Sequence, residues 1–240
     1  MSKQTRLSVI IPTLNEAQNI SELLSFLQKE LKGVNHEVIV VDAQSSDQTA
    51  QISSKLGALV LTCNEKCRAQ QMNEGAAIAN GEILYFVHAD STPPNGFLDD
   101  IFQALAEGYD IGCFRFKFDS SNWLLKINSF FTKFDRDMFR GGDQTLFVKN
   151  LYFKSLGGYD ASFRIMEEYD FLRKARQELK FKIIPKDVIV SARKYEENSY
   201  FRVNLANLVV FTAYKWGVSQ ARLLKLYKKL IKHPKPEALE

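Results

Sequence analysis

Carboxylate side chains follow predicted strands in this chain of 240 residues. Asp90 stands three residues after Ile83 to Val87, an apolar, aromatic and β-branched run that suits a strand buried on both faces of a parallel sheet. A carboxylate just past the carboxyl end of such a strand lies where open α/β sheets bind ligands, so Asp90 is the first candidate for chemistry. The alternative is that Asp90 only caps the turn that Ser91, Thr92 and Pro93 continue.

Two further carboxylates follow the first two predicted strands. Glu16 ends the segment Pro-Thr-Leu-Asn-Glu, and Asp42 ends the second strand. An acceptor-only side chain in a crevice can take the N–H of a nucleobase or the hydroxyls of a ribose. Helix capping for Glu16 and an Asx turn for Asp42 are the structural alternatives. No glycine-rich loop follows the first strand, which argues against a dinucleotide site and excludes a P-loop there.

The second half of the chain holds three more groups of polar residues. Acidic residues begin a predicted helix at Glu167, Glu168 and Asp170, where carboxylates also simply suit the helix dipole. Gly141-Gly142-Asp143-Gln144 precedes a strand and reads equally as a glycine turn. Arg193 and Lys194 follow the last strand, where a cation could hold a diphosphate or a basic loop could be solvated.

Strands and helices alternate through the first 90 residues, which predicts a parallel, doubly wound sheet. The expected strands there are residues 7–11, 37–41, 58–61 and 83–88, with helices at 20–31, 45–56 and 66–80. The second half is mixed, with expected helices at 97–107, 123–134, 167–178, 200–216 and 220–232 and strands at 111–118, 144–148, 181–184 and 188–190. The helix at 123–134 carries an apolar stripe: Trp123, Leu124, Ile127, Phe130, Phe131 and Phe134.

Composition limits the class of protein. An apolar content of 45% supports a full core and argues against disorder. The N-terminus lacks the apolar core of a signal peptide, and polar residues between Phe201 and Val218 argue against a spanning helix. Three cysteines without paired metal-type spacing indicate reduced thiols, so we expect a cytoplasmic protein.

Several segments together resemble the family 2 glycosyltransferases. They are SVIIPTLNE (8–16), EVIVVDAQSSDQT (37–49), CRAQQMNEGAAIANGEILYFVHAD (67–90) and MEEYDF (166–171). The chain is most similar to a small bacterial subgroup that carries an RxxQMN segment and a HAD version of the aspartate motif. The resemblance implies a GT-A fold and a single domain over residues 1–240, with a nucleotide-binding half (1–90), an acceptor and catalytic half (91–198) and C-terminal helices (199–240).

The resemblance also implies roles for individual residues. The donor, a nucleotide-diphosphate sugar with uracil as the expected base, would be bound by Pro12, Thr13, Asn15, Glu16, Asp42, Arg68, His88 and Asp90. Asp90 matches the last aspartate of the family's D-x-D and would bind Mn²⁺ or Mg²⁺. His88 stands at the place of the first aspartate, where an imidazole can ligate a metal or form a hydrogen bond. Asp143 and Gln144 would lie on the acceptor side, and Arg193 and Lys194 near the diphosphate.

The reaction implied is the inverting transfer of a sugar to an acceptor hydroxyl. A divalent cation neutralises the departing diphosphate, and a carboxylate on the other face of the sugar takes the acceptor's proton. The position of the family's base is Glu168 here, with Glu167 beside it and Asp170 as the alternative if the helix register differs. The rival hypothesis is a non-catalytic nucleotide-sugar binder or membrane-associated scaffold. A sugar-nucleotidyltransferase would need a glycine-rich, lysine-bearing loop that PTLNE does not supply.

The C-terminal region is basic. Eight lysines and arginines and no acidic residue lie between Asn198 and Pro236, although the whole chain carries a net charge of only +4. The last predicted helix, 220–232, has an apolar and a basic face, which predicts either docking on an anionic membrane, at the inner face, or ordinary packing with a solvated basic side. A lipid-linked or saccharide acceptor fits such a protein. The basic residues lack interleaved stacking aromatics, so we expect no nucleic acid partner.

Overall fold

Four parallel strands stand side by side in the N-terminal part of the computed structural model, which describes residues 6–232. They are β1 (Leu7–Thr13), β2 (His36–Asp42), β3 (Leu59–Thr62) and β4 (Ile83–Phe86), in the order β3-β2-β1-β4. The helices that connect them are α1 (Ala17–Glu30), α2 (Thr49–Lys55) and α3 (Arg68–Ile78). Because β1 and β4 are neighbours, the residues that follow both strands meet at one edge of the sheet.

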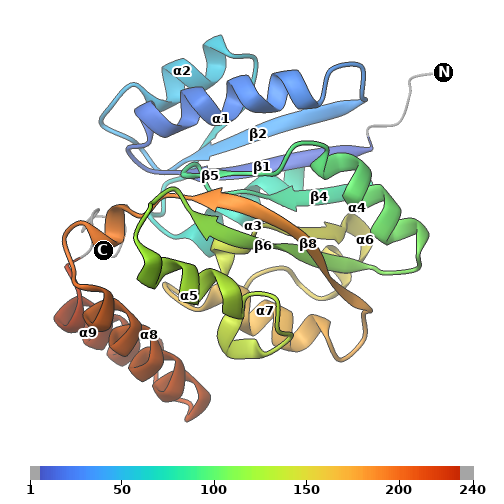
Figure 1. The fold of residues 1–240 in the computed structure, drawn as a ribbon. Helices are drawn as coiled ribbons and strands as arrows, with labels where there is room; N and C mark the ends of the chain where they lie inside the picture. The colour runs from blue at the N-terminus through green and yellow to red at the C-terminus, as the bar shows by residue number, and fades with distance from the viewer. Residues whose placement is uncertain (1–5, 233–240) are drawn as a thin grey trace.

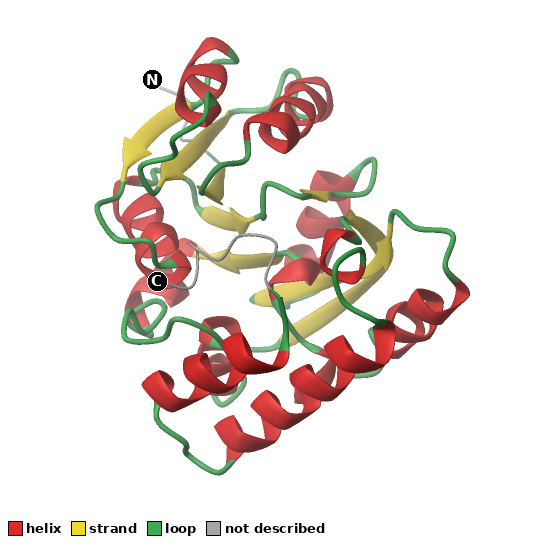
Figure 2. Cartoon of the chain, turned by 90° about the vertical axis from the view of Figure 1, so that its left-hand side faces the viewer, coloured by secondary structure: helices red, strands yellow, loops and turns green. Residues whose placement is uncertain are grey.

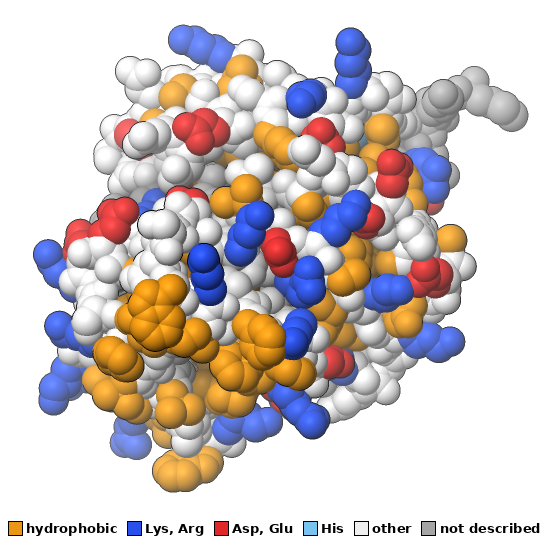
Figure 3. All heavy atoms as spheres, in the orientation of Figure 1, with side chains coloured by type: hydrophobic (Ala, Val, Ile, Leu, Met, Phe, Trp, Pro, Cys, Tyr) orange, Lys and Arg blue, Asp and Glu red, His pale blue; other side chains and the backbone are white. Residues whose placement is uncertain are grey.

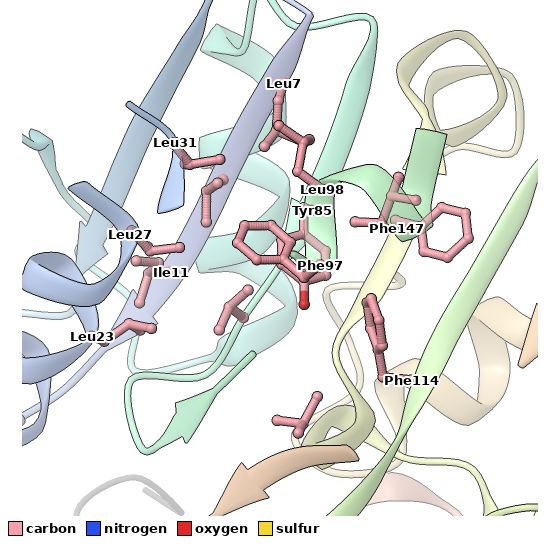
Figure 4. Packing of buried hydrophobic residues seen from close by; sticks show 14 of the residues in the cluster. Leu7, Ile11, Leu23, Leu27, Leu31, Tyr85, Phe97, Leu98, Phe114 and Phe147 are labelled. Carbon is pink, nitrogen blue, oxygen red and sulfur yellow. The ribbon is translucent and has the colours of Figure 1, made fainter. Parts of the chain in front are cut away.

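Both faces of this half-sheet are covered, as the unbroken apolar strands predict. Successive side chains of a strand point to opposite faces, and Ile11 packs on the α1 side while Ile10 packs on the α3 side. Figure 4 shows the first of these cores, where Leu23 and Leu27 of α1 approach Ile11. Figures 1 and 2 show helices on the two sides of the strands, which is the doubly wound arrangement expected from the sequence.

The second half extends the same sheet with mixed strand directions. The added strands are β5 (Ser91–Thr92), β6 (Ile111–Phe118), β7 (Leu146–Lys149) and β8 (Phe181–Val190), which complete the order β3-β2-β1-β4-β7-β6-β8-β5. Four of the seven neighbouring pairs are parallel, and β7 runs antiparallel to both β4 and β6. The short β5 pairs with the end of β8, so the loop after β8 comes close to Asp90.

The remaining helices flank this part of the sheet. They are α4 (Phe97–Ala106), α5 (Trp123–Phe131), α6 (Asn150–Ser155), α7 (Glu167–Ala175), α8 (Tyr200–Lys215) and α9 (Gln220–Leu230). Three short 3₁₀ turns also occur in the described residues: η1 (Asp137–Phe139), η2 (Gly142–Gln144) and η3 (Arg193–Tyr195).

Several boundaries differ from the sequence-based expectation. The two strands expected at 181–184 and 188–190 are one strand, β8, whose register shifts opposite Phe114 and Arg115 so that Pro185 and Lys186 are left out of the pairing. A proline lacks the N–H that a ladder needs, and the irregularity absorbs it. The central strand ends at Phe86, before His88. The short elements β5 and α6 were not expected, because two or six residues carry little periodicity.

The apolar faces of α5 and α9 lie in different environments. Leu125 is the buried residue of α5, whereas most of the predicted apolar stripe of this helix is exposed. In α9, Leu223 is buried against Ile165 and Val210, so the apolar face of this helix packs inside the protein. Contact of its basic side with a membrane stays a prediction, and residues 233–240 of the basic tail lie outside the described residues.

Candidate active site

A cavity of about 600 Å³ opens at the edge of the sheet where β1 and β4 end. It gathers ten of the residues singled out from the sequence: Pro12, Thr13, Glu16, Arg68, His88, Asp90, Asp143, Glu168, Arg193 and Lys194. Five others lie outside its lining: Asn15, Asp42, Gln144, Glu167 and Asp170. The first group comes from both halves of the chain, as a parallel sheet extended by antiparallel strands permits.

One end of the cavity is organised by Arg193. Its Nη2 lies 2.8 Å from Oε1 of Glu16 and 2.8 Å from Oδ2 of Asp90. The backbone N–H of Ser191 donates to the carbonyl of Asp90 at 3.1 Å, which fixes the loop after β8 beside the end of β4. Two carboxylates therefore share one guanidinium, and these two ion pairs raise the pKa of Arg193 against the opposing effect of burial.

Asp42 and Asn15 support the strand ends from behind the cavity. Oδ1 of Asp42 accepts a hydrogen bond from Thr13 Oγ1 at 3.0 Å, and its Oδ2 accepts the N–H of Ser45 at 2.9 Å. Asn15 has a left-handed backbone (φ 52°), and its side-chain oxygen accepts the N–H of Ser46 at 2.8 Å. These bonds join the loops after β1 and β2, which gives both residues a structural reason to be present.

The RxxQMN segment also ties distant parts of the chain together. Gln71 donates from Nε2 to the carbonyl oxygens of Thr13 (2.8 Å) and Val41 (2.7 Å), which terminate neighbouring strands. Asn73 exchanges two hydrogen bonds with the backbone of Tyr159, at 2.7 and 2.9 Å. This helix thereby connects the strand ends with the loop that leads to α7, where the second set of carboxylates begins.

A second pair of cavity residues is His88 and Glu168. His88 Nε2 lies 3.4 Å from Oε1 of Glu168, and both side chains are largely buried. Burial acts to lower the pKa of His88, but the contact with Glu168 outweighs it and the pKa is raised. Burial acts to raise the pKa of Glu168, but His88 and the charge of Arg68 outweigh it and the pKa is lowered. Both shifts favour the ion pair, because Glu168 stays ionised to lower pH and His88 keeps its proton to higher pH than the free groups do.

Gly142 lies directly against the pair formed by His88 and Glu168. A Cβ atom on Gly142 would lie 2.3 Å from Glu168 Oε1 and 2.3 Å from His88 Cε1, closer than side chains approach. A Cβ on the adjacent Gly141 would meet only Tyr169, at an ordinary 3.5 Å. The second glycine of the Gly-Gly pair thus leaves the space in which His88 and Glu168 come together.

Glu167 and Asp170 point away from the cavity. Glu167 is fully buried, and the Nε of Arg68 lies 2.9 Å from its Oε1. Burial raises the pKa of Glu167 despite the nearby guanidinium. Asp170 pairs with Arg173 at 2.9 Å and Lys174 at 2.7 Å, both on its own helix. Glu168 is therefore the carboxylate of the three that faces the cavity.

A model of glycosyl transferase family 2 matches residues 8–166. This range includes the three strand-end carboxylates, Glu16, Asp42 and Asp90, and the glycine pair. The chain belongs to this family. Residues 167–240 lie outside the match. The choice of Glu168 as a site residue therefore relies on the geometry described above and on its motif.

This chain is similar in sequence to proteins that are named as transferases. It is 34% identical over 111 residues to a dolichol-phosphate mannosyltransferase of Pyrococcus furiosus, a match that covers 44% of this chain and 32% of that protein. It is 26% identical over 223 residues to an undecaprenyl-phosphate 4-deoxy-4-formamido-L-arabinose transferase of Proteus mirabilis, which covers 86% of this chain and 66% of that protein. The chain spans less than two thirds of the length of either relative.

Solved structures share the fold. Residues 1–349 of Staphylococcus aureus TarS, in complex with UDP-GlcNAc, superpose with a TM-score of 0.63 at 19% identity, covering 94% of this chain and 71% of that one. The mannosyltransferase PcManGT of Pyrobaculum calidifontis, in complex with GDP-Man and Mn²⁺, gives 0.66 at 20% identity, covering 99% and 73%. These similarities establish the GT-A fold for this chain.

The divalent ion expected from the family can be tested against the residues present. Among residues 6–232, no group of three or more His, Cys, Asp and Glu side chains is placed to hold a metal ion. Asp90 offers a carboxylate to the cavity, while the Nε2 of His88 faces Glu168. One carboxylate suits the mode in which substrate phosphates and water supply the other ligands of Mg²⁺. A single carboxylate is compatible with a metal that arrives with a nucleotide, and that carboxylate, Asp90, also pairs with Arg193 at 2.8 Å.

Some residues of the site were not anticipated from the sequence. Asn128 of α5 and Tyr200 of α8 line the cavity and are joined by a hydrogen bond of 2.9 Å from the tyrosine hydroxyl. Gln71 was seen only as part of a motif, and its bonds to two strand ends were not predicted. No local pattern signals such contacts, because the partners are separated by 30 to 72 residues.

Proposed function

We propose that this chain transfers a sugar from a UDP-linked donor to an acceptor hydroxyl, with inversion at the anomeric carbon. The observation that carries the proposal is one cavity lined both by Asp90 with Arg193 and by Glu168 with His88. A leaving diphosphate needs positive charge, and an attacking hydroxyl needs a base, so the two pairs supply different chemistry. The names of the relatives and the UDP-GlcNAc complex of TarS support a nucleotide-sugar donor.

We assign the donor to the end near Asp90. Thr13 and Glu16 line this end at the close of β1 and would contact the nucleotide. Arg193 would hold diphosphate oxygens, since a guanidinium binds phosphate through several hydrogen bonds. When bound, a divalent ion at Asp90 would supply further charge to neutralise the leaving group.

We assign the proton transfer to Glu168. The lowered pKa of this carboxyl keeps it ionised at neutral pH, which is the state that accepts a proton. As the acceptor oxygen forms its bond to the anomeric carbon, the bond from that carbon to the diphosphate breaks and UDP leaves with the electron pair. The acceptor's proton passes to Glu168. His88 acts as a positioning residue here, because its Nε2 contact orients the carboxylate.

Calorimetry with UDP tests the donor half of this proposal. We expect UDP to bind more tightly with Mn²⁺ or Mg²⁺ than after chelation, and Asp90→Asn to lose most of that difference while it keeps the fold, because the site is at a strand end and not in the core. Equal affinity for UDP with and without metal would contradict a role for the metal in donor binding.

Release of UDP from nucleotide sugars tests the catalytic half. Water can replace the acceptor in slow donor hydrolysis, so turnover is measurable before the acceptor is identified. Binding of UDP without any release from a panel of UDP-linked sugars would favour the rival hypothesis of a non-catalytic binder. A thermal-shift screen of nucleotide sugars selects the donors for this assay, since a specific ligand stabilises the folded state by mass action.

A further inference from the structure

Helices α5 and α8 expose an unusual amount of apolar surface. Six large side chains on or next to these helices are each more than half exposed: Trp123, Phe130, Phe201, Leu205, Leu208 and Trp216. We call these residues the α5–α8 face. Figure 3 shows hydrophobic side chains gathered over the region of the two helices, with lysine and arginine side chains around them. Soluble proteins seldom expose large contiguous apolar patches unless something binds there.

The spacing in α8 shows that this helix has two apolar sides. Val203, Ala206 and Val210 are buried on the inner side. Phe201 and Leu205, four residues apart, stand on the outer side with Leu208 one turn further along. A helix of a globular protein normally buries one apolar stripe and keeps polar residues on its other side. Within residues 6–232 nothing covers the outer side, so it lacks the partner that its composition calls for.

We propose that the α5–α8 face docks on the surface of an anionic lipid bilayer. The proposal goes beyond the transfer reaction and does not depend on it. It names a different surface from the basic helix α9, whose apolar face is already used inside the protein.

Charge favours a bilayer over a second copy of the chain. Helix α8 carries Arg202 and Lys215 and no acidic residue. On α5 and the turn after it, Lys126 and Lys133 are exposed, and the Lys133 ammonium lies 3.5 Å from the centre of the Phe130 ring. A symmetric dimer through this face would bring like charges together, whereas anionic head groups complement them.

Acidic residues near the face are already paired. Asp135 and Asp137 follow α5, and Arg176 contacts both, at 2.5 and 3.5 Å. Their charges are thus partly neutralised, for Asp137 also by Lys215 of α8 at 3.6 Å. Exposed tryptophans at the ends of both helices, Trp123 and Trp216, are side chains that favour the boundary between water and lipid.

The face is continuous with the cavity. Ile127 and Phe131 of α5 and Leu208 and Phe211 of α8 line the cavity wall. A molecule docked through this face would therefore hold the mouth of its cavity at the membrane surface. No helix among residues 6–232 has the length and apolarity to cross a bilayer, so the contact proposed is interfacial.

Flotation of the full chain with vesicles tests the proposal. We expect the protein to float with phosphatidylglycerol vesicles at low salt, less with phosphatidylcholine vesicles, and less as salt rises. The triple variant Phe130→Ser, Phe201→Ser, Leu205→Ser should lower the partition coefficient about 100-fold or more, since each change removes a large side chain from the lipid interface. None of these three residues lines the cavity.

A matched control uses exposed apolar residues elsewhere on the surface. Leu59→Ser, Ile78→Ser and Leu151→Ser change exposed apolar positions on β3, α3 and α6 and should leave flotation unchanged. UDP calorimetry on both triple variants checks that the fold and donor end survive. Absence of flotation at low salt, or equal loss in both triple variants, would overturn the proposal.

Sedimentation without lipid tests the alternative that a second copy of the chain occupies the α5–α8 face. A dimer of the natural chain that the face variant dissociates, together with failed flotation, would assign the face to a second copy and overturn the membrane proposal. Flotation without any UDP binding would contradict the proposed transferase function and would still support membrane docking through the α5–α8 face.

Discussion

Replacing Gly142 with alanine should disable the catalytic end of the cavity while leaving the donor end intact. The added Cβ would lie 2.3 Å from Glu168 Oε1 and from His88 Cε1, against ordinary contacts of 3.4 Å or more. Both the carboxylate and the imidazole must therefore move by about 1 Å, or the Gly142 backbone must shift away from them, and a misplacement of that size can cost roughly 10²-fold in rate. We expect the rate of UDP release to fall by about that factor.

The adjacent glycine provides the matched control. Gly141 has an extended backbone (φ 170°), which any residue adopts, and its added Cβ would make only an ordinary contact with Tyr169. Gly142 has no left-handed backbone either. The two alanine variants therefore differ in the space available and not in backbone strain. Gly141→Ala should release UDP within a few-fold of the natural rate.

Three measurements make this prediction decisive. UDP affinity by calorimetry should change little in Gly142→Ala, because the atoms nearest to the added Cβ belong to Glu168 and His88 and not to Asp90 or Arg193. Thermal unfolding should show a modest loss, since overpacking typically costs about 1–3 kcal/mol. If Gly142→Ala releases UDP at the natural rate with an intact fold, the contact of His88 with Glu168 does not position the base and the reasoning fails.

Three further outcomes follow from the same geometry. Glu168→Gln should lower the rate of transfer by about 10²–10⁴ with UDP affinity nearly unchanged, and Asp170→Asn should cost less, whereas the reverse order would move the base to Asp170. Arg193→Gln should weaken UDP about 10–100-fold in calorimetry but leave uridine unaffected, because the diphosphate would then face Glu16 and Asp90 without their cation. The pKa of Glu167 is raised in the folded state from 4.5, so the folded protein binds the proton more tightly and loses stability as pH rises above that value. Glu167→Gln removes this loss of stability. The melting temperature of the variant minus that of the natural chain should therefore increase from about pH 5 to about pH 8. A difference that stays constant with pH would contradict the raised pKa.

Much of the fold could be predicted because it depends on short segments. The apolar runs around β1, β2 and β4 and the helical periods between them determine a parallel half-sheet covered on both faces, since side-chain period alone decides which positions are buried. A carboxylate at the end of such a strand then lies at the ligand-binding edge. Asp90 is accordingly in the cavity, whereas Asp42, at the end of β2, lies outside its lining.

The mixed half was less predictable, because its strand order depends on contacts between distant segments. The sequence does not reveal that β7 runs antiparallel beside β4, or that Pro185 leaves β8 unbroken. It also could not say which way the α5 stripe faces. A period shows that Trp123 and Phe130 share a side of the helix, but only the neighbours in space decide whether that side is buried, and here it is exposed.

The sequence by itself determined the family, the doubly wound half and the set of polar residues that could do chemistry, because these reside in motifs and local periods. Only the tertiary structure decided which of those residues act together. Arg193 reaches Glu16 across 177 residues of sequence. Glu168 rather than Asp170 faces the cavity because α7 begins at Glu167, after Met166 in a left-handed conformation (φ 70°), and Asp170 pairs with Arg173 and Lys174 of its own helix. The space that Gly142 leaves for His88 and Glu168 is likewise a property of three segments packed together, which no single stretch of the chain contains.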